Sequence, residues 1–230
     1  MQQHDQTYRR RFLALMFGCL ADATIAAYPV NSKHLIARAQ SMQETPLNPR
    51  LYTFVGGAWG TWSVEQINAV IGDSLPPVAK MNVIHGPTGE LPGGTEWVLR
   101  GVTSNVRYVH RSEQSSLVAK QLAPGRREAT HAALIPIKKS AAWWDLPQDE
   151  RRRIFEETSH HIAIGLKFLP EIARRLHHCR ELGETEPFDF LTWFDYAPEN
   201  SPAFEDLVAQ LRATEEWAYV EREVDIRLVR

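Results

Sequence analysis

The order of patterned segments after residue 130 is the feature that most restricts the fold. The apolar run Ala132–Ile137 predicts a short buried strand, and the segment from about Pro147 to Lys167 predicts the longest helix. Pro170 ends or interrupts that helix. Further segments follow: an extended or helical stretch over 171–182, a strand over 187–194, a helix over 202–216 and an alternating strand over 219–228. This β-α-β order, repeated once, is typical of a ferredoxin-like α+β unit.

The part of the chain before residue 131 predicts a looser copy of the same unit. Strands are expected at 51–55, 97–102 and 106–109, and helices at 63–71, where Ser63 offers a cap, and at 112–122. A globular domain over 49–230 is therefore expected. Its N-terminal half covers about 49–130 and its C-terminal half about 131–230.

Residues 1–48 differ in character from this domain. Arg9, Arg10 and Arg11 precede an apolar run that ends near Leu20, and small residues follow, which is the layout of an export signal of the twin-arginine kind. The apolar run is short, and Met42 offers a second start. Two alternatives stay open: a genuine signal, which predicts a periplasmic protein, or a disordered or untranslated extension of a cytoplasmic one.

Composition excludes several classes of protein. With 230 residues, of which 43% are hydrophobic and 23% charged, the chain can bury a core. Its net charge of −2 and scattered arginines argue against nucleic acid as a ligand. Cys19 and Cys179 have no zinc spacing, and no stretch reaches the roughly 18 apolar residues of a membrane span.

Two pairs of histidines are candidates for chemistry. His160 and His161 lie in the longest predicted helix, where an imidazole can bind a metal through one ring nitrogen while the other donates to an acceptor. A structural role is the alternative for either residue. His177 and His178 follow Pro170, and in a strand they would point to opposite faces, so they could not share one metal.

Cations, indoles and carboxylates supply further candidates. The run from Lys138 to Trp144 joins two lysines to two tryptophans, which suits the edge of a haem or, alternatively, a tryptophan-capped core with surface lysines. Glu215 and Glu216 could accept a hydrogen bond from a ligating histidine or be solvated charge.

Taken together, these stretches resemble the chlorite dismutase family. The resemblance rests on Ile135–Trp144, Ser159–His161, Arg174–His178 and Phe188–Phe194, and a weaker match extends back to about Leu51. It implies ferredoxin-like repeats that form a dimeric α/β barrel with an abbreviated first half, as in the short-chain branch, whose members are typically homodimers. It also implies that the half over 131–230 binds haem b.

The resemblance assigns roles to seven residues. His161 matches the proximal iron ligand and Arg174 the distal arginine, while Glu216 matches the acceptor of the ligand's other nitrogen, with Glu215 as an alternative. Three further residues match positions near the propionates and the haem edge: Lys139, Trp143 and Tyr108. Gln121 matches a glutamine that can hydrogen-bond the distal arginine.

The implied function is decomposition of chlorite to chloride and dioxygen at a ferric haem, through a hypochlorite intermediate. Two alternatives remain open. A coproheme decarboxylase of haem synthesis shares the fold but commonly lacks the distal arginine and uses a reactive tyrosine, for which Tyr108 is the candidate. A haem-binding or sensing protein without turnover is the other.

Overall fold

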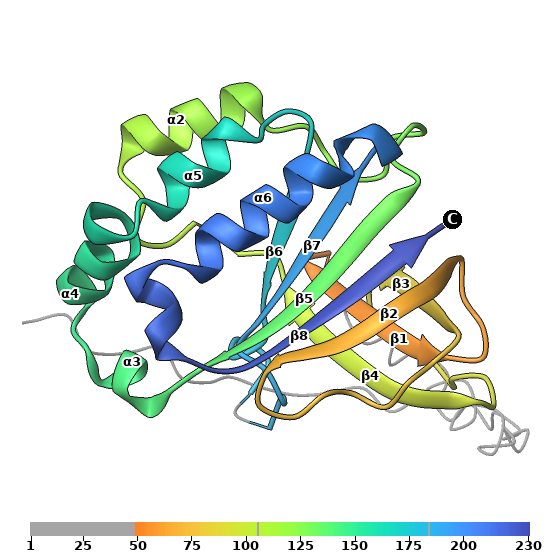
Figure 1. Ribbon diagram of the computed structural model, residues 1–230. Helices are drawn as coiled ribbons and strands as arrows, with labels where there is room; N and C mark the ends of the chain where they lie inside the picture. Colours follow the sequence, from red (N-terminus) through yellow and green to blue (C-terminus); the bar gives the residue numbers. More distant parts are fainter. Residues whose placement is uncertain (1–48, 105, 184) are drawn as a thin grey trace, which may run out of the picture. The chain divides into compact units, whose positions relative to one another are not determined.

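A computed structural model describes residues 49–230 except 105 and 184, and its eight strands form a closed antiparallel barrel (Figure 1). Neighbouring strands follow the order β1-β3-β2-β8-β5-β7-β6-β4. Their bounds are β1 Leu51–Gly57, β2 Trp62–Ile71, β3 Lys80–His85, β4 Thr95–Val102, β5 His131–Lys139, β6 Ala173–His178, β7 Phe190–Tyr196 and β8 Val220–Val229.

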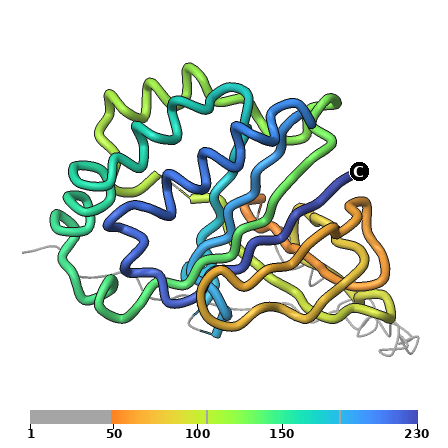
Figure 2. The backbone as a smooth tube through the Cα atoms, viewed as in Figure 1, coloured from red at the N-terminus to blue at the C-terminus, as the bar shows by residue number. Residues whose placement is uncertain are grey.

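The helices gather on one side of the barrel, over strands of the C-terminal half (Figures 1 and 2). Helices α5 and α6 pack against β5 and β7 through an apolar cluster that includes Ile135, Phe194, Phe204 and Leu207. The helices are α2 Arg111–Lys120, α3 Ala141–Asp145, α4 Gln148–Arg152, the π-helix η1 Arg153–Thr158, α5 His161–Lys167, α6 Ser201–Arg212, and the 3-10 helices η2 Pro198–Asn200 and η3 Glu215–Tyr219.

Strand alternation gives the sheet two different faces. Leu191 and Trp193 of β7 belong to the core cluster inside the barrel, whereas Phe194 faces α6. In the register of β6 with β7, Arg174 pairs with Phe194 and Arg175 with Trp193. Because paired residues of adjacent strands project to the same side, Arg174 belongs to the outer face and Arg175 to the inner face.

The helix predicted over 63–71 is wrong, because this segment is strand β2. It pairs with β8, and the register shifts between Val64 and Gln66 and again between Ala69 and Ile71. A bulge adds a residue and breaks the two-residue period. The inward-facing Val64 and Ile67 are therefore three residues apart, which is the spacing that a helix would give.

The structure differs from the prediction at two other places in the N-terminal half. Strand β3 was not anticipated, since its residues lack a clear alternation after Pro76 and Pro77. The segment 106–109, predicted to be a strand, is a loop in which Tyr108 has a positive φ of 60°.

The long helix predicted from Pro147 to Lys167 is divided into α4, η1 and α5. The division lies at His160, whose φ of 54° and ψ of 33° are left-handed. The segment after Pro170 is extended, as the strand interpretation predicts. The last helix ends at Arg212, so Glu215 and Glu216 lie in η3 rather than in α6.

The predicted export signal lies outside the described residues. Within the part of the chain that the structure describes, no helix has the length and apolar character needed to cross a bilayer. The described residues all belong to one compact unit.

Candidate functional site

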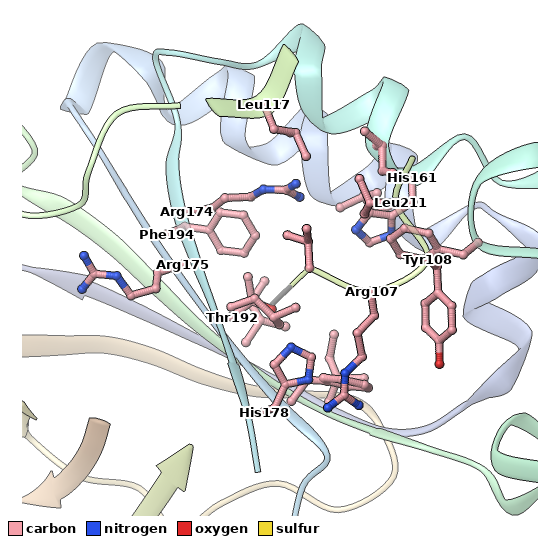
Figure 3. A pocket seen from close by; sticks show the side chains of 18 of the residues that line it. Arg107, Tyr108, Leu117, His161, Arg174, Arg175, His178, Thr192, Phe194 and Leu211 are labelled. Carbon is pink, nitrogen blue, oxygen red and sulfur yellow. The ribbon is translucent and has the colours of Figure 1, made fainter. Parts of the chain in front are cut away.

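A cavity of about 610 Å³ lies between the outer face of the sheet and the helices (Figure 3). Its lining is mostly apolar, with contributions from α2, α5, α6 and the loop that precedes α2. All seven residues singled out from the sequence line this cavity: Tyr108, Gln121, Lys139, Trp143, His161, Arg174 and Glu216. The structure therefore brings the whole predicted set to one place.

His161 lies at one side of the cavity in a buried polar network. Its Nδ1 is 2.7 Å from Oε2 of Glu216, and the other carboxylate oxygen of Glu216 accepts from Lys139 Nζ at 2.8 Å. Glu216 and Lys139 are both buried. Burial alone would raise the pKa of Glu216, but the neighbouring His161 and Lys139 lower this pKa to about 2. Glu216, rather than Glu215, is therefore the anionic acceptor.

The backbone around His161 is held by two side chains that sequence reasoning missed. The Glu156 carboxylate accepts from the backbone N–H groups of Ile162 and Ala163, at 2.5 and 3.2 Å. These are free donors of the first turn of α5, where left-handed His160 provides no side-chain cap. Ser159 Oγ accepts from the backbone N–H of Glu216 at 2.9 Å, which joins η3 to the start of α5.

Phe155 fixes the plane of the His161 ring. The two rings are stacked with centroids 4.3 Å apart and an interplanar angle of 24°. With Nδ1 held by Glu216, the imidazole has Nε2 free for a ligand in the cavity, which is the arrangement of a metal-binding histidine with an ordered acceptor. Among the described residues, no group of three or more His, Cys, Asp or Glu side chains could hold a metal ion.

Arg174 reaches into the cavity from β6, and Figure 3 shows its guanidinium and the His161 ring on the same side of the strand. Burial lowers the pKa of Arg174 from its ordinary value, although an arginine stays charged. Gly165 of α5 leaves room for this side chain, since a Cβ there would lie 3.2 Å from Arg174 Nη1. Within the described residues, no carboxylate forms an ion pair with Arg174.

Gln121 hydrogen-bonds the main chain of Arg174. Its Nε2 donates to the backbone carbonyl of Arg174 at 2.8 Å, rather than bonding to the guanidinium. Gln121 follows α2 and is exposed. It therefore holds the strand that carries the arginine.

The charge of Lys139 is engaged within the chain. Its Nζ is buried in the ion pair with Glu216 and lies 4.8 Å from the centroid of the Trp143 ring. The cation is thus beside an indole, as the sequence indicates, but its charge is directed to the carboxylate behind His161. Trp143 itself is buried, and its Nε1 has no hydrogen-bond partner among the described residues.

Tyr108 lies at the cavity edge, and Figure 3 shows its hydroxyl directed away from Arg174. The hydroxyl accepts a hydrogen bond from Arg151 Nη1 at 3.1 Å. The ring lies edge-on to Trp143, with centroids 6.2 Å apart. This engaged hydroxyl gives no support to the reactive tyrosine of the decarboxylase alternative.

His178 is a further polar residue of the cavity, to which the sequence gave no role. Figure 3 shows it beside Arg107, and its Nδ1 is buried without a hydrogen-bond partner in the described chain. Burial, together with the charge of Arg107, lowers the pKa of His178 to about 4. His177 lies on the other face of β6, against Tyr52 and Phe54 of β1. The prediction that these two histidines face opposite ways is confirmed.

Comparisons with known proteins agree with this arrangement. The sequence pattern of the family described as chlorite dismutase matches residues 93–230. A chlorite dismutase from Ideonella dechloratans is 30% identical over 128 residues, which are 53% of this chain and 40% of that protein. The chain thus spans less than half the length of that relative.

Solved structures extend the likeness. A dimeric chlorite dismutase from Nitrobacter winogradskyi is 57% identical, with a TM-score of 0.71 over 78% of this chain and 99% of that one. The chlorite dismutase of Candidatus Nitrospira defluvii, solved in complex with imidazole, is 18% identical, with a TM-score of 0.59 over 84% and 95% of the two chains. The second shows a common fold, and the predicted fold class is confirmed. With the family pattern covering more than half of its length, this chain belongs to the chlorite dismutase family.

Proposed function

We propose that this protein is a haem b enzyme that decomposes chlorite to chloride and dioxygen through a hypochlorite intermediate. The observation that carries the proposal is the pairing of His161 and Glu216 in the same apolar cavity as the unpaired cation of Arg174. The first pair suits an iron ligand with an anionic acceptor, and the second group suits a small anion.

The residues present fit a haem. A volume of about 610 Å³ lies within the range of roughly 300–1,000 Å³ typical of cofactor sites. Its apolar walls suit a flat macrocycle, and His161 would hold the iron through Nε2. The buried Trp143 Nε1 and His178 Nδ1 both lack partners in the described chain and could donate to carboxylates at the edge of the group. When bound, ferric haem supplies a Lewis-acidic, redox-active iron for one chlorite oxygen.

The network behind His161 sets the character of this ligand. Glu216 accepts the Nδ1 proton, which fixes the tautomer and makes the imidazole a stronger donor. Lys139 offsets the carboxylate charge, so that Glu216 remains an anion although it is buried. Phe155 and Glu156 prevent rotation of the ring and of the first turn of α5.

Arg174 acts on the substrate side. Its permanent forked charge would attract chlorite and hold hypochlorite in the cavity until both chlorite oxygen atoms leave as dioxygen and the chlorine leaves as chloride, so that ClO2⁻ gives Cl⁻ and O2. The charge is effective because the walls of the cavity are largely apolar. We also propose that the protein is a homodimer, in keeping with the dimeric relative from Nitrobacter winogradskyi.

The test is oxygen release from chlorite by the purified haem-loaded protein, measured with a Clark electrode. Arg174→Ala should slow turnover by about 2–4 kcal/mol of transition-state stabilisation, a factor of roughly 30–1,000. Escaping hypochlorite should also bleach the haem sooner. The control is Arg100→Ala, which removes an exposed arginine of β4 that is paired with Glu186. Unchanged turnover and unchanged inactivation in Arg174→Ala would show that the assigned role is wrong.

A further inference from the structure

The 3-10 helix η3 carries Glu216 and depends on its neighbours for its position. It has five residues and lies between α6 and β8 (Figure 1). The hydrogen-bond geometry of a 3-10 helix is poorer than that of an α-helix, so such a segment needs other attachments. Ser159 accepts from the backbone N–H of Glu216, and the carbonyl of Tyr219 accepts from the backbone N–H of Ser140. Trp217 provides a third attachment, through its side chain.

This third attachment is a hydrogen bond from the Trp217 indole to Glu223 of β8. Trp217 Nε1 donates to Oε2 of Glu223 at 2.7 Å. Glu223 pairs with Ile137 of β5, which belongs to the apolar cluster under α6, so its side chain lies on the outer face of the sheet. This side chain is completely buried, and both Trp217 and Glu223 line the cavity of His161. The bond therefore fixes η3 to the sheet from within the protein.

The second oxygen of Glu223 is also engaged. Its Oε1 accepts from Nε and Nη2 of Arg212, at 2.9 and 2.7 Å. Arg212 is the last residue of α6, and it also donates to Asp225 of β8 at 2.8 Å. A buried carboxylate needs such a cation, because an unpaired charge in the interior is strongly destabilising. The Glu223 carboxylate thus joins α6, η3 and β8.

The Trp217 ring also contacts the lysine that balances Glu216. Lys139 Nζ lies 5.4 Å from the centroid of the Trp217 ring, within the distance of about 6 Å at which a cation is attracted to an aromatic face. The same Nζ donates to the Glu216 carboxylate at 2.8 Å and to the Glu216 backbone carbonyl at 3.2 Å. A movement of Trp217 would therefore disturb the lysine and the carboxylate together.

We propose that Glu223 is a positioning residue for His161. It acts through Trp217 and η3, which place the Glu216 carboxylate against His161 Nδ1. This role rests on the proposed function, because an iron bound to His161 is what responds to the strength of the acceptor. When the bond to Trp217 is lost, η3 is free to shift and the hydrogen bond between His161 and Glu216 weakens. The imidazole then becomes a weaker donor to a metal.

Resonance Raman spectra of the haem-loaded, ferrous full-length protein test the proposal through the iron–histidine stretching band. Trp217→Phe keeps an aromatic ring and removes the donor. Glu223→Gln leaves one acceptor oxygen for two donors, and the charged Arg212 should take it. Both variants should shift the band to lower frequency. The midpoint potential of the iron should rise, because a weaker donor favours ferric iron less. Trp217→Phe serves if Glu223→Gln does not fold.

A double variant and a matched control separate positioning from general loosening. Trp217→Phe combined with Glu223→Gln should shift the band no further than either change alone, because both remove the same hydrogen bond. The control is Trp59→Phe, which removes an indole donor to Thr95 Oγ1 outside this cavity and should leave the band in place. The affinity of the single variants for haem should fall by less than about tenfold, since losing a direct partner of a ligand costs about 10–100-fold.

The outcomes distinguish this role from the proposed function. Equal shifts that do not add in the double variant would support the role of Glu223. An unchanged band in both single variants would overturn it, as would shifts that add, or an equal shift in Trp59→Phe. If the natural sequence itself shows no iron–histidine band, the proposed iron ligand is wrong as well. A normal band in the natural sequence with unshifted variants would leave the proposed function intact.

Discussion

The two faces of strand β6 carry similar residues in different surroundings. On the outer face, Arg174 and His178 line a large cavity that helices cover, opposite an imidazole that is hydrogen-bonded to Glu216. On the inner face, Arg175 and His177 lie among the aromatic residues of the barrel core. The same residue types therefore serve different ends. What covers the strand decides whether an arginine faces a cofactor-sized cavity or the packed interior of the barrel.

Replacing His161 should have the largest effect, and it tests the outer face. His161→Ala removes the proposed iron ligand, so the affinity for haem should fall by roughly 100-fold or more, since losing even a supporting partner costs about 10–100-fold. The Soret band of the reconstituted protein, titrated with haem, measures the loss.

The matched control is His160→Asn, because asparagine tolerates the left-handed backbone of that position. This variant should keep the affinity for haem. The comparison of the two faces would break if His161→Ala bound haem as the natural sequence does.

The second prediction concerns His177 on the inner face and the dependence of stability on pH. The pKa of His177 is about 4 in the folded protein, below the ordinary value of 6.5, so the unfolded chain binds more protons between these values. Stability should therefore fall as the pH drops from about 6.5 towards 4. The share of His177 is at most about 1.4 kcal/mol per pH unit.

His177→Asn should remove that share of the slope, while it retains a donor for the Leu191 carbonyl. Denaturant unfolding at pH 4.5, 5.5 and 6.5 measures the free energy of unfolding in both proteins. Parallel slopes would show that His177 does not change its protonation on unfolding in this range.

Gly165→Ala should have the smallest effect and separates chemistry from stability on the outer face. The new Cβ would lie 3.2 Å from Arg174 Nη1, which forces the guanidinium to move by a few tenths of an ångström. Turnover should fall by less than about tenfold, given that misplacement by 1 Å can cost about 100-fold.

The free energy of unfolding should change little in this variant. Alanine favours a helix over glycine by roughly 0.5–1 kcal/mol, which offsets the crowding against Arg174. Steady-state oxygen release and thermal unfolding measure the two quantities. Gly89→Ala, where a Cβ would have no neighbour within 4 Å, is the control. Equal turnover in the two variants would mean that the position of Arg174 is not critical.

The sequence predicted the C-terminal half better than the N-terminal half, for local reasons. Strands β5, β7 and β8 have regular alternation or continuous apolar runs, and Pro170 separates α5 from β6. In β2, bulges disturb the period, so its apolar spacing resembles that of a helix. No local pattern marks β3, which owes its extended form to pairing with β1.

The candidate site shows the same limit. His161 and Arg174 were chosen because the distance between them in the sequence matches the pattern of the family, and the structure places both in one cavity. The partners of Lys139 and Gln121 depend on segments distant in the chain, since Glu216 is 77 residues from Lys139 and Arg174 is 53 from Gln121. The capping of α5 by Glu156 leaves no signature in the sequence, because glutamate is not a preferred residue type for that task.

The closure of the barrel also bears on how β6 moves. This strand pairs along its whole length with β7, but with β4 only where His178 meets Val102. Most of its other edge relies on side chains, such as the Gln121 amide that donates to the Arg174 carbonyl. The edge of β6 towards β7 is therefore held by a full ladder of pairs, and the edge towards β4 by one pair. Separation of β6 from β4 requires the loss of that one pair only. Such an opening would displace Arg174 and Arg175 together, because both lie on β6.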